Sequence, residues 1–408
     1  MRREIAALRI AGARGDIGGV WFEGPLEMGF AVCLHARVAM RVLLEVARFP
    51  VDSADALYAG ARAVDWQAWM NTRTTLAVSA DVSDAPELRH SGFAALKVKD
   101  AVVDALRDAL GARPNVNARA PDVAIRLHVQ GSDAKLFLDL AGDPLHRRGY
   151  RVAMTDAPLK ETLAAAVLAL GRVDLDLPFV DPMCGSGTLA IEHALAARRI
   201  APGLQRRFGF QRWPLFGGDV AKRAWDRLVT AAREDRLPAA PAPIVCAERF
   251  PDAVAAAEKN AVAAGVAGDL TFDVGDVRSA SPRWPRGSLV TNPPYGERLM
   301  GDATGAAQAA ARRPGSRPPA PADAGRLPRD LHVQQLKLAG LYRGMSEALG
   351  RFGGWGVVVL SGNPMWTQEM RQRPAISHRL FNGPLEVRLL RYEMPEAKPA
   401  PPAKPATT

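Results

Sequence analysis

The segment from 177 to 200 restricts the fold of the whole chain, because it joins an apolar run, a glycine-rich turn and a helix-like stretch. Residues 177–180 are typical of a short buried strand, and residues 189–200 repeat apolar positions as a helix does. Between them, Gly185 and Gly187 let the backbone approach a ligand closely. This order is typical of the first unit of a doubly wound α/β sheet that binds a nucleotide cofactor.

The turn differs from two well-known phosphate-binding loops. It lacks the full GxGxxG spacing of dinucleotide folds, and no lysine follows Gly187. Asp181 before the glycines, together with an Asn-Pro-Pro-Tyr stretch further along the chain, fits S-adenosylmethionine (SAM) instead. We expect Asp181 to lie near the cationic methionine end of SAM. The residues of this turn expected to bind the cofactor are Asp181, Pro182, Cys184, Gly185, Ser186, Gly187 and Thr188.

Two further acidic residues follow predicted strands. Glu248 comes directly after a run at 243–247, and Asp276 follows a run at 270–274. A carboxylate at the first position can accept both ribose hydroxyls, as in related dinucleotide folds, and the second position suits the adenine amino group. Either acid alone could equally be a helix N-cap or a solvated turn residue. Their joint placement after successive strands favours the cofactor site.

Residues 292–295, Asn-Pro-Pro-Tyr, predict an active-site loop that holds a planar base carrying an amino group. They follow an apolar run at 288–291 that suits the end of a buried strand, and the two prolines fix the backbone. The Asn292 side-chain oxygen and the Pro293 carbonyl can each accept one N–H, while Tyr295 stacks on the ring. The catalytic residues are therefore predicted to be Asn292, Pro293, Pro294 and Tyr295, with Asn292 also close to the cofactor. A simple Pro-Pro turn is the alternative for this motif in isolation.

Composition limits the class of protein. The 408 residues, 48% hydrophobic and 24% charged, predict a globular chain of two or three domains. We expect no transmembrane helix and no signal peptide, and hence a cytoplasmic location. Cys33, Cys184 and Cys246 are far apart and lack metal-ligand spacing, so neither a disulfide nor a metal site is expected.

The net charge of +10 indicates an anionic partner, with nucleic acid as the leading candidate. Arg147, Arg148 and Arg151 cluster around Gly149 and Tyr150 and are predicted to contact RNA phosphates. Solvated surface is the alternative reading of these arginines.

Several longer stretches resemble one family. Residues 89–100 are similar to the THUMP signature of this family. Residues 144–151 and 157–163 are similar to the family's connector, and residues 208–214 (FGFQRWP) are similar to its catalytic core. Matches at 292–299, 361–364 and 380–383 continue the likeness. The chain resembles the THUMP-containing RNA guanine-N2 methyltransferases, especially the bacterial group that acts on 23S rRNA.

The resemblance implies a ferredoxin-like domain, a THUMP domain and a Rossmann-like seven-stranded methyltransferase domain. The expected boundaries are 1–65 for the ferredoxin-like domain, 66–143 for THUMP, 144–160 for a connector and 161–394 for the methyltransferase domain. The family's opening strand is missing before the first helix, so the ferredoxin-like domain is expected to be truncated. Residues 300–329 and 395–408 are rich in Ala and Pro and are expected to be disordered.

The resemblance also implies the reaction, which is SAM-dependent methyl transfer to the exocyclic N2 of a guanosine in 23S rRNA. Within the THUMP signature it adds Lys97 and Lys99 as RNA contacts. Guanine-N2 methylation of tRNA and adenine-N6 methylation of RNA or DNA stay open. So do glutamine methylation of a protein and a non-catalytic RNA-binding role.

Overall fold

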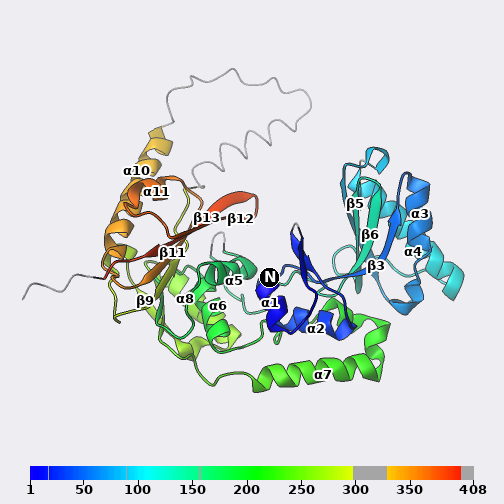
Figure 1. The fold of residues 1–408 in the computed structure, drawn as a ribbon, viewed down its shortest axis with the longest axis horizontal. Helices are drawn as coiled ribbons and strands as arrows, with labels where there is room; N and C mark the ends of the chain where they lie inside the picture. The colour runs from blue at the N-terminus through cyan, green and yellow to red at the C-terminus, as the bar shows by residue number, and fades with distance from the viewer. Residues whose placement is uncertain (17, 89, 156–157, 297–328, 397–408) are drawn as a thin grey trace, which may run out of the picture. The chain divides into compact units, whose positions relative to one another are not determined.

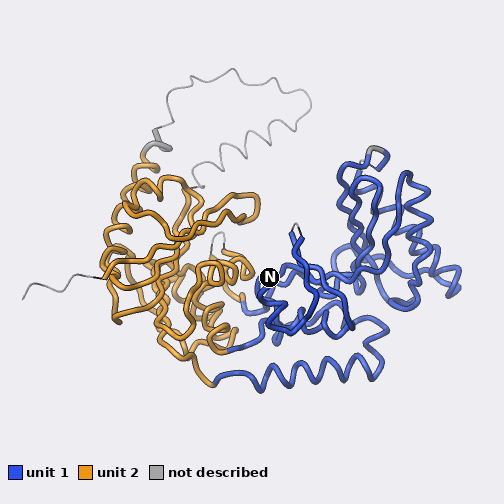
Figure 2. The backbone as a smooth tube through the Cα atoms, in the orientation of Figure 1, with its two compact units in different colours: residues 1–150, 199–237 blue, residues 151–198, 238–408 orange. Residues whose placement is uncertain are grey.

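The computed structural model describes residues 1–16, 18–88, 90–155, 158–296 and 329–396. They form two compact units, shown in Figure 2. Unit 1 contains Met1–Tyr150 and Arg199–Leu237, and unit 2 contains Arg151–Arg198 and the chain from Pro238 onward. The two segments expected to be disordered, 300–329 and 395–408, lie outside the described residues apart from Arg329, Pro395 and Glu396.

Unit 2 is built on a seven-stranded sheet, which confirms the fold predicted for this part of the chain. Its strand order is β12-β13-β11-β10-β7-β8-β9. The five strands from β11 to β9 in that order are parallel, and β13 runs antiparallel to β11. The strands are β7 (Phe179–Asp181), β8 (Ile244–Glu248), β9 (Leu270–Val274), β10 (Ser288–Thr291), β11 (Gly356–Ser361), β12 (Ile376–Asn382) and β13 (Leu385–Glu393).

Helices cover both faces of this sheet (Figure 1). The α10 side chains Leu338, Tyr342 and Met345 share one apolar cluster with Leu289 and Val357 of the central strands. Central strands covered on both faces are buried along their whole length, which explains their continuous apolar runs. The helices of unit 2 are α5 (Glu161–Leu170), α6 (Thr188–Ala197), α8 (Pro251–Ala264), α10 (Arg329–Leu349) and α11 (Met365–Glu369).

The parallel strands bring the predicted site residues to one edge of the sheet. Asp181 and Glu248 are the last residues of β7 and β8, and Asn292 follows the last residue of β10. Carboxyl ends of parallel strands meet at the same edge, where open α/β sheets bind their ligands.

Unit 1 contains a two-stranded sheet, β1-β2, and a four-stranded sheet of order β3-β6-β5-β4. The predicted boundary at 65/66 divides the four-stranded sheet. β3 lies before this boundary, but it pairs from Leu43 to Pro50 with β6, which lies after it. The strands are β1 (Arg14–Asp16), β2 (Gly19–Trp21), β3 (Leu43–Pro50), β4 (Leu76–Ser83), β5 (Val123–Gln130) and β6 (Asp133–Asp139). The helices are α1 (Arg2–Ala7), α2 (Leu26–His35), α3 (Ala54–Arg62), α4 (Ser91–Leu110) and α7 (Asp219–Glu234).

The stretch 208–214, which was predicted to belong with the catalytic core, packs in unit 1 instead. The ring of Phe210 stacks on Phe30 of α2 with 4.1 Å between centroids. The Trp213 indole N–H donates to the Asp122 carbonyl at 3.1 Å, and the Gly209 N–H donates to the Ala141 carbonyl at 3.1 Å. These large aromatic side chains complete the core of unit 1, so burial of their apolar surface fixes the segment there.

Candidate active site

The glycine-rich turn joins β7 to α6 in a backbone conformation that requires glycine. Gly187 precedes α6 with φ of +84°, in the left-handed region. A Cβ atom at this position would lie 3.0 Å from the Cβ of Ala257 in α8. The turn therefore packs closely on α8.

Arg151 holds the turn from the connector side. Its guanidinium donates to the hydroxyl oxygens of Ser186 and Thr188, each at 3.0 Å. It also forms an ion pair with Glu161 of α5 at 2.9 Å, and only 12% of its side chain is exposed. The prediction that Arg151 contacts RNA is therefore wrong, because its donors are already used inside unit 2. Ser186 and Thr188 act as acceptors that position the turn.

Asn260 of α8 holds the same turn, although no role was predicted for it from the sequence. Its Oδ1 accepts hydrogen bonds from the main-chain N–H groups of Val152 and Ala153, both at 2.9 Å. Its Nδ2 donates to the carbonyls of Ala153 at 2.9 Å and Ser186 at 3.0 Å. The side chain is fully buried with all four hydrogen bonds made, so it joins connector, turn and helix.

A cavity of about 350 Å³ lies beside the ends of β7, β8 and β9. Pro182, Ala247 and Asp276 line it together with Val277. Cys184 is a buried filler beside it, and its main-chain N–H donates to the Ala247 carbonyl at 3.0 Å. Of the residues predicted to bind the cofactor, Pro182 and Asp276 line this cavity. The others are not among its lining residues: Asp181, Cys184, Gly185, Ser186, Gly187, Thr188, Glu248 and Asn292.

The carboxylates of Glu248 and Asp276 are anchored by main-chain N–H groups. Glu248 accepts from Gly185 at 3.3 Å and from Arg249 at 2.8 Å. Asp276 accepts from the Arg278 N–H at 2.9 Å and forms an ion pair with the Arg278 guanidinium at 2.6 Å. The hydrogen bond from Arg278 lowers the pKa of Asp276 to about 2, which keeps this carboxylate ionised. Asp276 therefore both caps a turn and lines the cavity.

Asp181 has a different electrostatic environment. It is 1% exposed, and its Oδ1 accepts from the Met183 N–H at 3.2 Å. Burial, reinforced by the nearby charge of Glu248, raises the pKa of Asp181 to about 8. A cation placed beside it would stabilise the ionised form, so the position suits the positively charged end of a ligand.

The Asn-Pro-Pro-Tyr loop is held by three contacts within unit 2. The Tyr295 hydroxyl donates to the Asn292 side-chain oxygen. Tyr342 of α10 donates to the Pro294 carbonyl at 2.7 Å, and Asn363 after β11 donates to the Tyr295 carbonyl at 2.9 Å. Among the described residues, the Pro293 carbonyl accepts no hydrogen bond, and Pro293 itself is buried.

Tyr342 is fully buried, and its burial raises the pKa of its hydroxyl to about 12, so the hydroxyl stays a donor. Tyr342 and Asn363 were not predicted as functional residues. The resemblance at 361–364 was the only sequence signal for Asn363, and no motif around residue 342 indicated a role for Tyr342.

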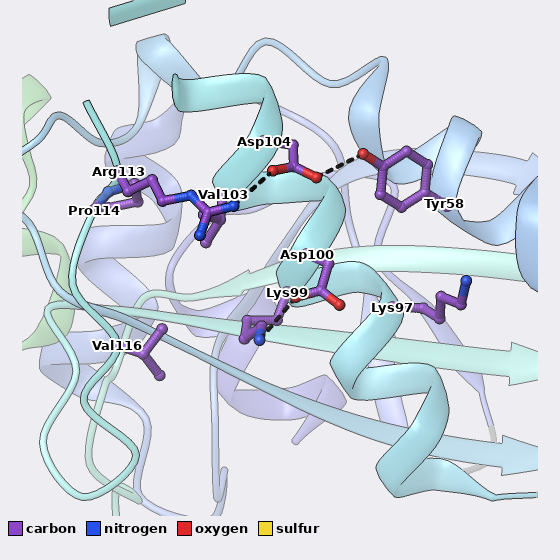
Figure 3. Close-up of a pocket in the computed structure, with 9 residues that line it drawn as sticks. All are labelled: Tyr58, Lys97, Lys99, Asp100, Val103, Asp104, Arg113, Pro114 and Val116. Atoms are coloured by element: carbon purple, nitrogen blue, oxygen red, sulfur yellow. Dashed lines mark hydrogen bonds and ion pairs between the residues drawn. The ribbon is translucent and has the colours of Figure 1, made fainter. Parts of the chain in front are cut away.

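The predicted RNA contacts of unit 1 separate into exposed and buried residues. Lys97 and Lys99 line a cavity of about 420 Å³ beside α4 (Figure 3). Lys99 forms an ion pair with Asp100 at 2.8 Å, and the Lys97 ammonium lies 5.8 Å from the ring centroid of Phe93. Arg113 at the same cavity forms an ion pair with Asp104 at 3.3 Å.

Arg147 and Arg148 differ in exposure: the first is exposed and the second is buried. Arg147 has 67% of its side chain exposed and forms an ion pair with Asp143 at 3.2 Å. Arg148 is 3% exposed, and it donates to the Leu145 carbonyl at 2.8 Å and to the Arg37 carbonyl. The prediction that Arg148 contacts RNA is therefore wrong, because this guanidinium is a buried structural donor in unit 1.

Two other features bear on the class of protein. Within the described ranges, no group of three or more His, Cys, Asp or Glu side chains is placed to hold a metal ion. None of the helices in the described part of the chain is both long and apolar enough to cross a membrane.

Three families match successive parts of the chain. Residues 1–43 match the RlmL ferredoxin-like domain, 51–139 the THUMP domain, and 148–307 the RMKL-like methyltransferase domain. A protein of Syntrophotalea carbinolica named "Ribosomal RNA large subunit methyltransferase K/L" is 38% identical over 97% of this chain. The chain spans about half of that relative, 52% of its length.

Two further proteins match along almost their full length. A Synechocystis protein named "Putative RNA methyltransferase slr0064" is 32% identical over 96% of this chain and 93% of its own length. The crystal structure of "SMU.472, a putative methyltransferase complexed with SAH" has a TM-score of 0.79 at 26% identity, covering 97% of this chain and 95% of that one. The chain therefore belongs to the family of RNA methyltransferases in which an RlmL ferredoxin-like domain and a THUMP domain precede an RMKL-like methyltransferase domain.

Proposed function

We propose that this protein is a SAM-dependent RNA methyltransferase that methylates the exocyclic N2 of a guanosine in 23S rRNA. The observation that carries the proposal is that the acids predicted to bind the cofactor and the groups predicted to hold the base lie at the same edge of one sheet. Asp181 and Glu248 end β7 and β8, while Asn292 and Pro293 follow β10, and these three strands are parallel neighbours in one sheet. The relative named for the large-subunit ribosomal RNA supports rRNA as the substrate.

SAM would bind at the sheet edge where β7, β8 and β9 end, next to the cavity that Pro182 and Asp276 line. Asp181 suits the cationic end, Glu248 the ribose hydroxyls and Asp276 the adenine amino group, as the acids of this fold class do for related cofactors. SAM supplies a methyl group on a sulfonium, which is already a good leaving group. The protein therefore has to bind, orient and dehydrate the two reactants.

Asn292 and Pro293 would orient the guanine amino group. A carbonyl oxygen has two lone pairs, so the Asn292 oxygen that accepts from Tyr295 can still accept one N–H of the base. The Pro293 carbonyl accepts the other N–H, and the nitrogen lone pair then points away from both acceptors. Orientation of this kind contributes about 7–11 kcal/mol to barrier lowering.

Tyr295 would hold the base after it leaves its stack. Unstacking costs a few kcal/mol, and stacking on an aromatic ring returns about 1–3 kcal/mol. In unit 1, the half-buried Lys97 and Lys99 and the exposed Arg147 would bind RNA phosphates.

Nucleoside mass spectrometry of fractionated RNA from a deletion strain and its parent tests this proposal. Loss of N2-methylguanosine from 23S rRNA alone is the expected result. Loss of N2-methylguanosine from tRNA would show that the substrate is tRNA instead of 23S rRNA. Unchanged nucleosides in both fractions, with SAM still bound by the purified protein, would direct the search to adenine or to a protein glutamine.

Substitution of Gly362 tests the position of Tyr295. A Cβ atom at Gly362 would lie 2.7 Å from the Tyr295 ring, so Gly362→Ala must displace that ring. Because misplacement by about 1 Å can cost about 10²-fold in rate, we expect a loss of that order in kcat/KM for rRNA at unchanged SAM affinity. Gly340→Ala in α10 is the matched control, since no atom lies within 4 Å of its added Cβ. Equal activity of the two variants would contradict a role for the ring.

A further inference from the structure

The β12–β13 hairpin extends past the sheet edge that carries the candidate active site. The pairing of β13 with β11 ends at Arg388 opposite Ser361, the last residue of β11. Residues 385–387 of β13 and their partners 380–382 of β12 lie beyond that point. Because β11 runs parallel to β10, this is the edge at which Asn292 follows β10 (Figure 1).

One face of the hairpin combines an exposed aromatic ring with two arginines. Arg379 pairs directly with Arg388, and Phe381 lies two residues beyond Arg379, so all three side chains share a face. Phe381 is 57% exposed, and the Arg379 guanidinium lies 5.4 Å from its ring centroid. A large exposed ring with a cation above it is a ready stacking surface for a nucleobase.

The same face has an excess of positive charge. Like charges directly opposite one another on a sheet are destabilising. Among the described residues, the only carboxylate that pairs with either arginine is Glu386, at 3.0 Å from Arg379. Arg388 is exposed and has no such partner within the described part of the chain. A phosphate bound between the arginines would remove their repulsion.

The face lies close to the catalytic loop. Gly362, the residue after Ser361, packs against the Tyr295 ring. Neighbouring strands lie about 4.8 Å apart, which places Arg388 about one strand spacing and Arg379 about two from the end of β11. An RNA strand with one base at Tyr295 would carry its neighbouring nucleotides across this face.

We propose that this face of the β12–β13 hairpin binds the single-stranded RNA next to the methylated base. Phe381 stacks on a flanking base, and Arg379 and Arg388 hold phosphates on either side of it. The segment is unpaired because a flanking base can stack on Phe381 only when it is not stacked and paired within a duplex. This inference rests on RNA being the substrate, as proposed above.

Binding of fluorescently labelled oligouridylate, followed by anisotropy, tests the face without involving a target guanine. We expect Phe381→Ala to weaken binding about 5- to 150-fold, the range for loss of one base–aromatic stack, and Phe381→Trp to retain it. Phe250→Ala is the matched ring control, because Phe250 is 58% exposed with the Arg249 guanidinium 4.9 Å from its ring centroid. This control is expected to leave oligouridylate binding unchanged.

The phosphate contact has its own readout. Arg388→Ala is expected to reduce the slope of log affinity against log salt by about 0.7, the value for one phosphate contact on a single strand. Arg373→Ala, an exposed arginine before the start of β12, is the matched control and should leave the slope unchanged.

Methyl incorporation into a 23S rRNA transcript, SAM affinity and Tm are measured on the same variants. Wild-type binding by Phe381→Ala and Arg388→Ala overturns the inference, even if the wild-type protein methylates rRNA. Hairpin-dependent binding without methyl incorporation by the wild type supports the inference and rejects the proposed reaction. A loss of binding accompanied by lower Tm and weaker SAM affinity makes the hairpin a packing element and also overturns the inference.

Discussion

Asn292→Ala is expected to remove nearly all methyl transfer to RNA while leaving SAM affinity close to that of the wild type. The substitution deletes the side-chain oxygen that would accept one N–H of the base and that now accepts the Tyr295 hydroxyl. Loss of one hydrogen-bonding group directed at the reacting centre typically lowers kcat about 10²–10³-fold. Single-turnover transfer of labelled methyl, measured beside a SAM titration, separates the two effects.

Tyr295→Phe is the matched control for this experiment. It removes the hydroxyl that donates to Asn292 but keeps the ring that would stack on the base. We therefore expect a smaller loss, of about the 5- to 10-fold that corresponds to one hydrogen bond of 1–1.5 kcal/mol. Near-normal turnover by Asn292→Ala would show that the loop does not orient the amino group.

The strands at the site could be predicted because their burial leaves a local pattern. The run at 288–291 coincides with β10, which is buried along its whole length because helices cover both faces of the sheet. The run at 270–274 coincides with β9, the edge strand of the sheet, in which only Leu270 is buried. Their order along the chain then places Asp276 and Asn292 after strands of a doubly wound sheet. Prediction of this kind needs only the spacing of residues in one segment.

The residues that hold these loops could not be predicted in this way. Arg151 and Arg148 look the same in the sequence as the exposed Arg147, yet both guanidinium groups bond inside the protein. Their partners come from other segments, such as Ser186 for Arg151. Asn260 likewise lies in the middle of α8, where no local pattern distinguishes it from a solvated residue.

The stretch 208–214 shows a second limit. The likeness to a family assigned FGFQRWP to the catalytic core. The stacking of Phe210 on Phe30 and the hydrogen bond from Trp213 to the Asp122 carbonyl place it in unit 1 instead. Contacts between distant segments determine where this stretch packs, and such contacts leave no periodic pattern in the sequence.

Asp181→Asn is expected to weaken SAM binding at pH 8 and to stabilise the protein there. The wild-type carboxylate has a pKa of about 8 because it is buried near Glu248. If it must be ionised to hold the cationic end of SAM, wild-type affinity falls about tenfold for each pH unit below 8. The variant lacks this group, so the ratio of the two affinities should rise with pH and level off above 8. The titration of SAM itself cancels in that ratio.

The stability of the two proteins should change in the opposite sense. An unfolded aspartate ionises near pH 3.9, whereas folded Asp181 stays protonated up to about pH 8. Between these values the folded state binds one more proton, so this group makes the wild type lose stability as pH rises. The advantage of Asp181→Asn in free energy of unfolding should therefore grow from pH 4 to pH 8, by about 1.4 kcal/mol for each unit of pKa shift.

Urea unfolding of both proteins across this pH range, without SAM, measures that difference. Titrating groups that do not interact with Asp181 contribute equally to the two proteins and cancel in the difference. A constant difference would mean that Asp181 is ionised throughout, and the tenfold dependence of SAM affinity should then be absent as well. The two measurements thus test one electrostatic cause: a carboxylate kept in an unfavourable site is stabilised only when a cation binds beside it.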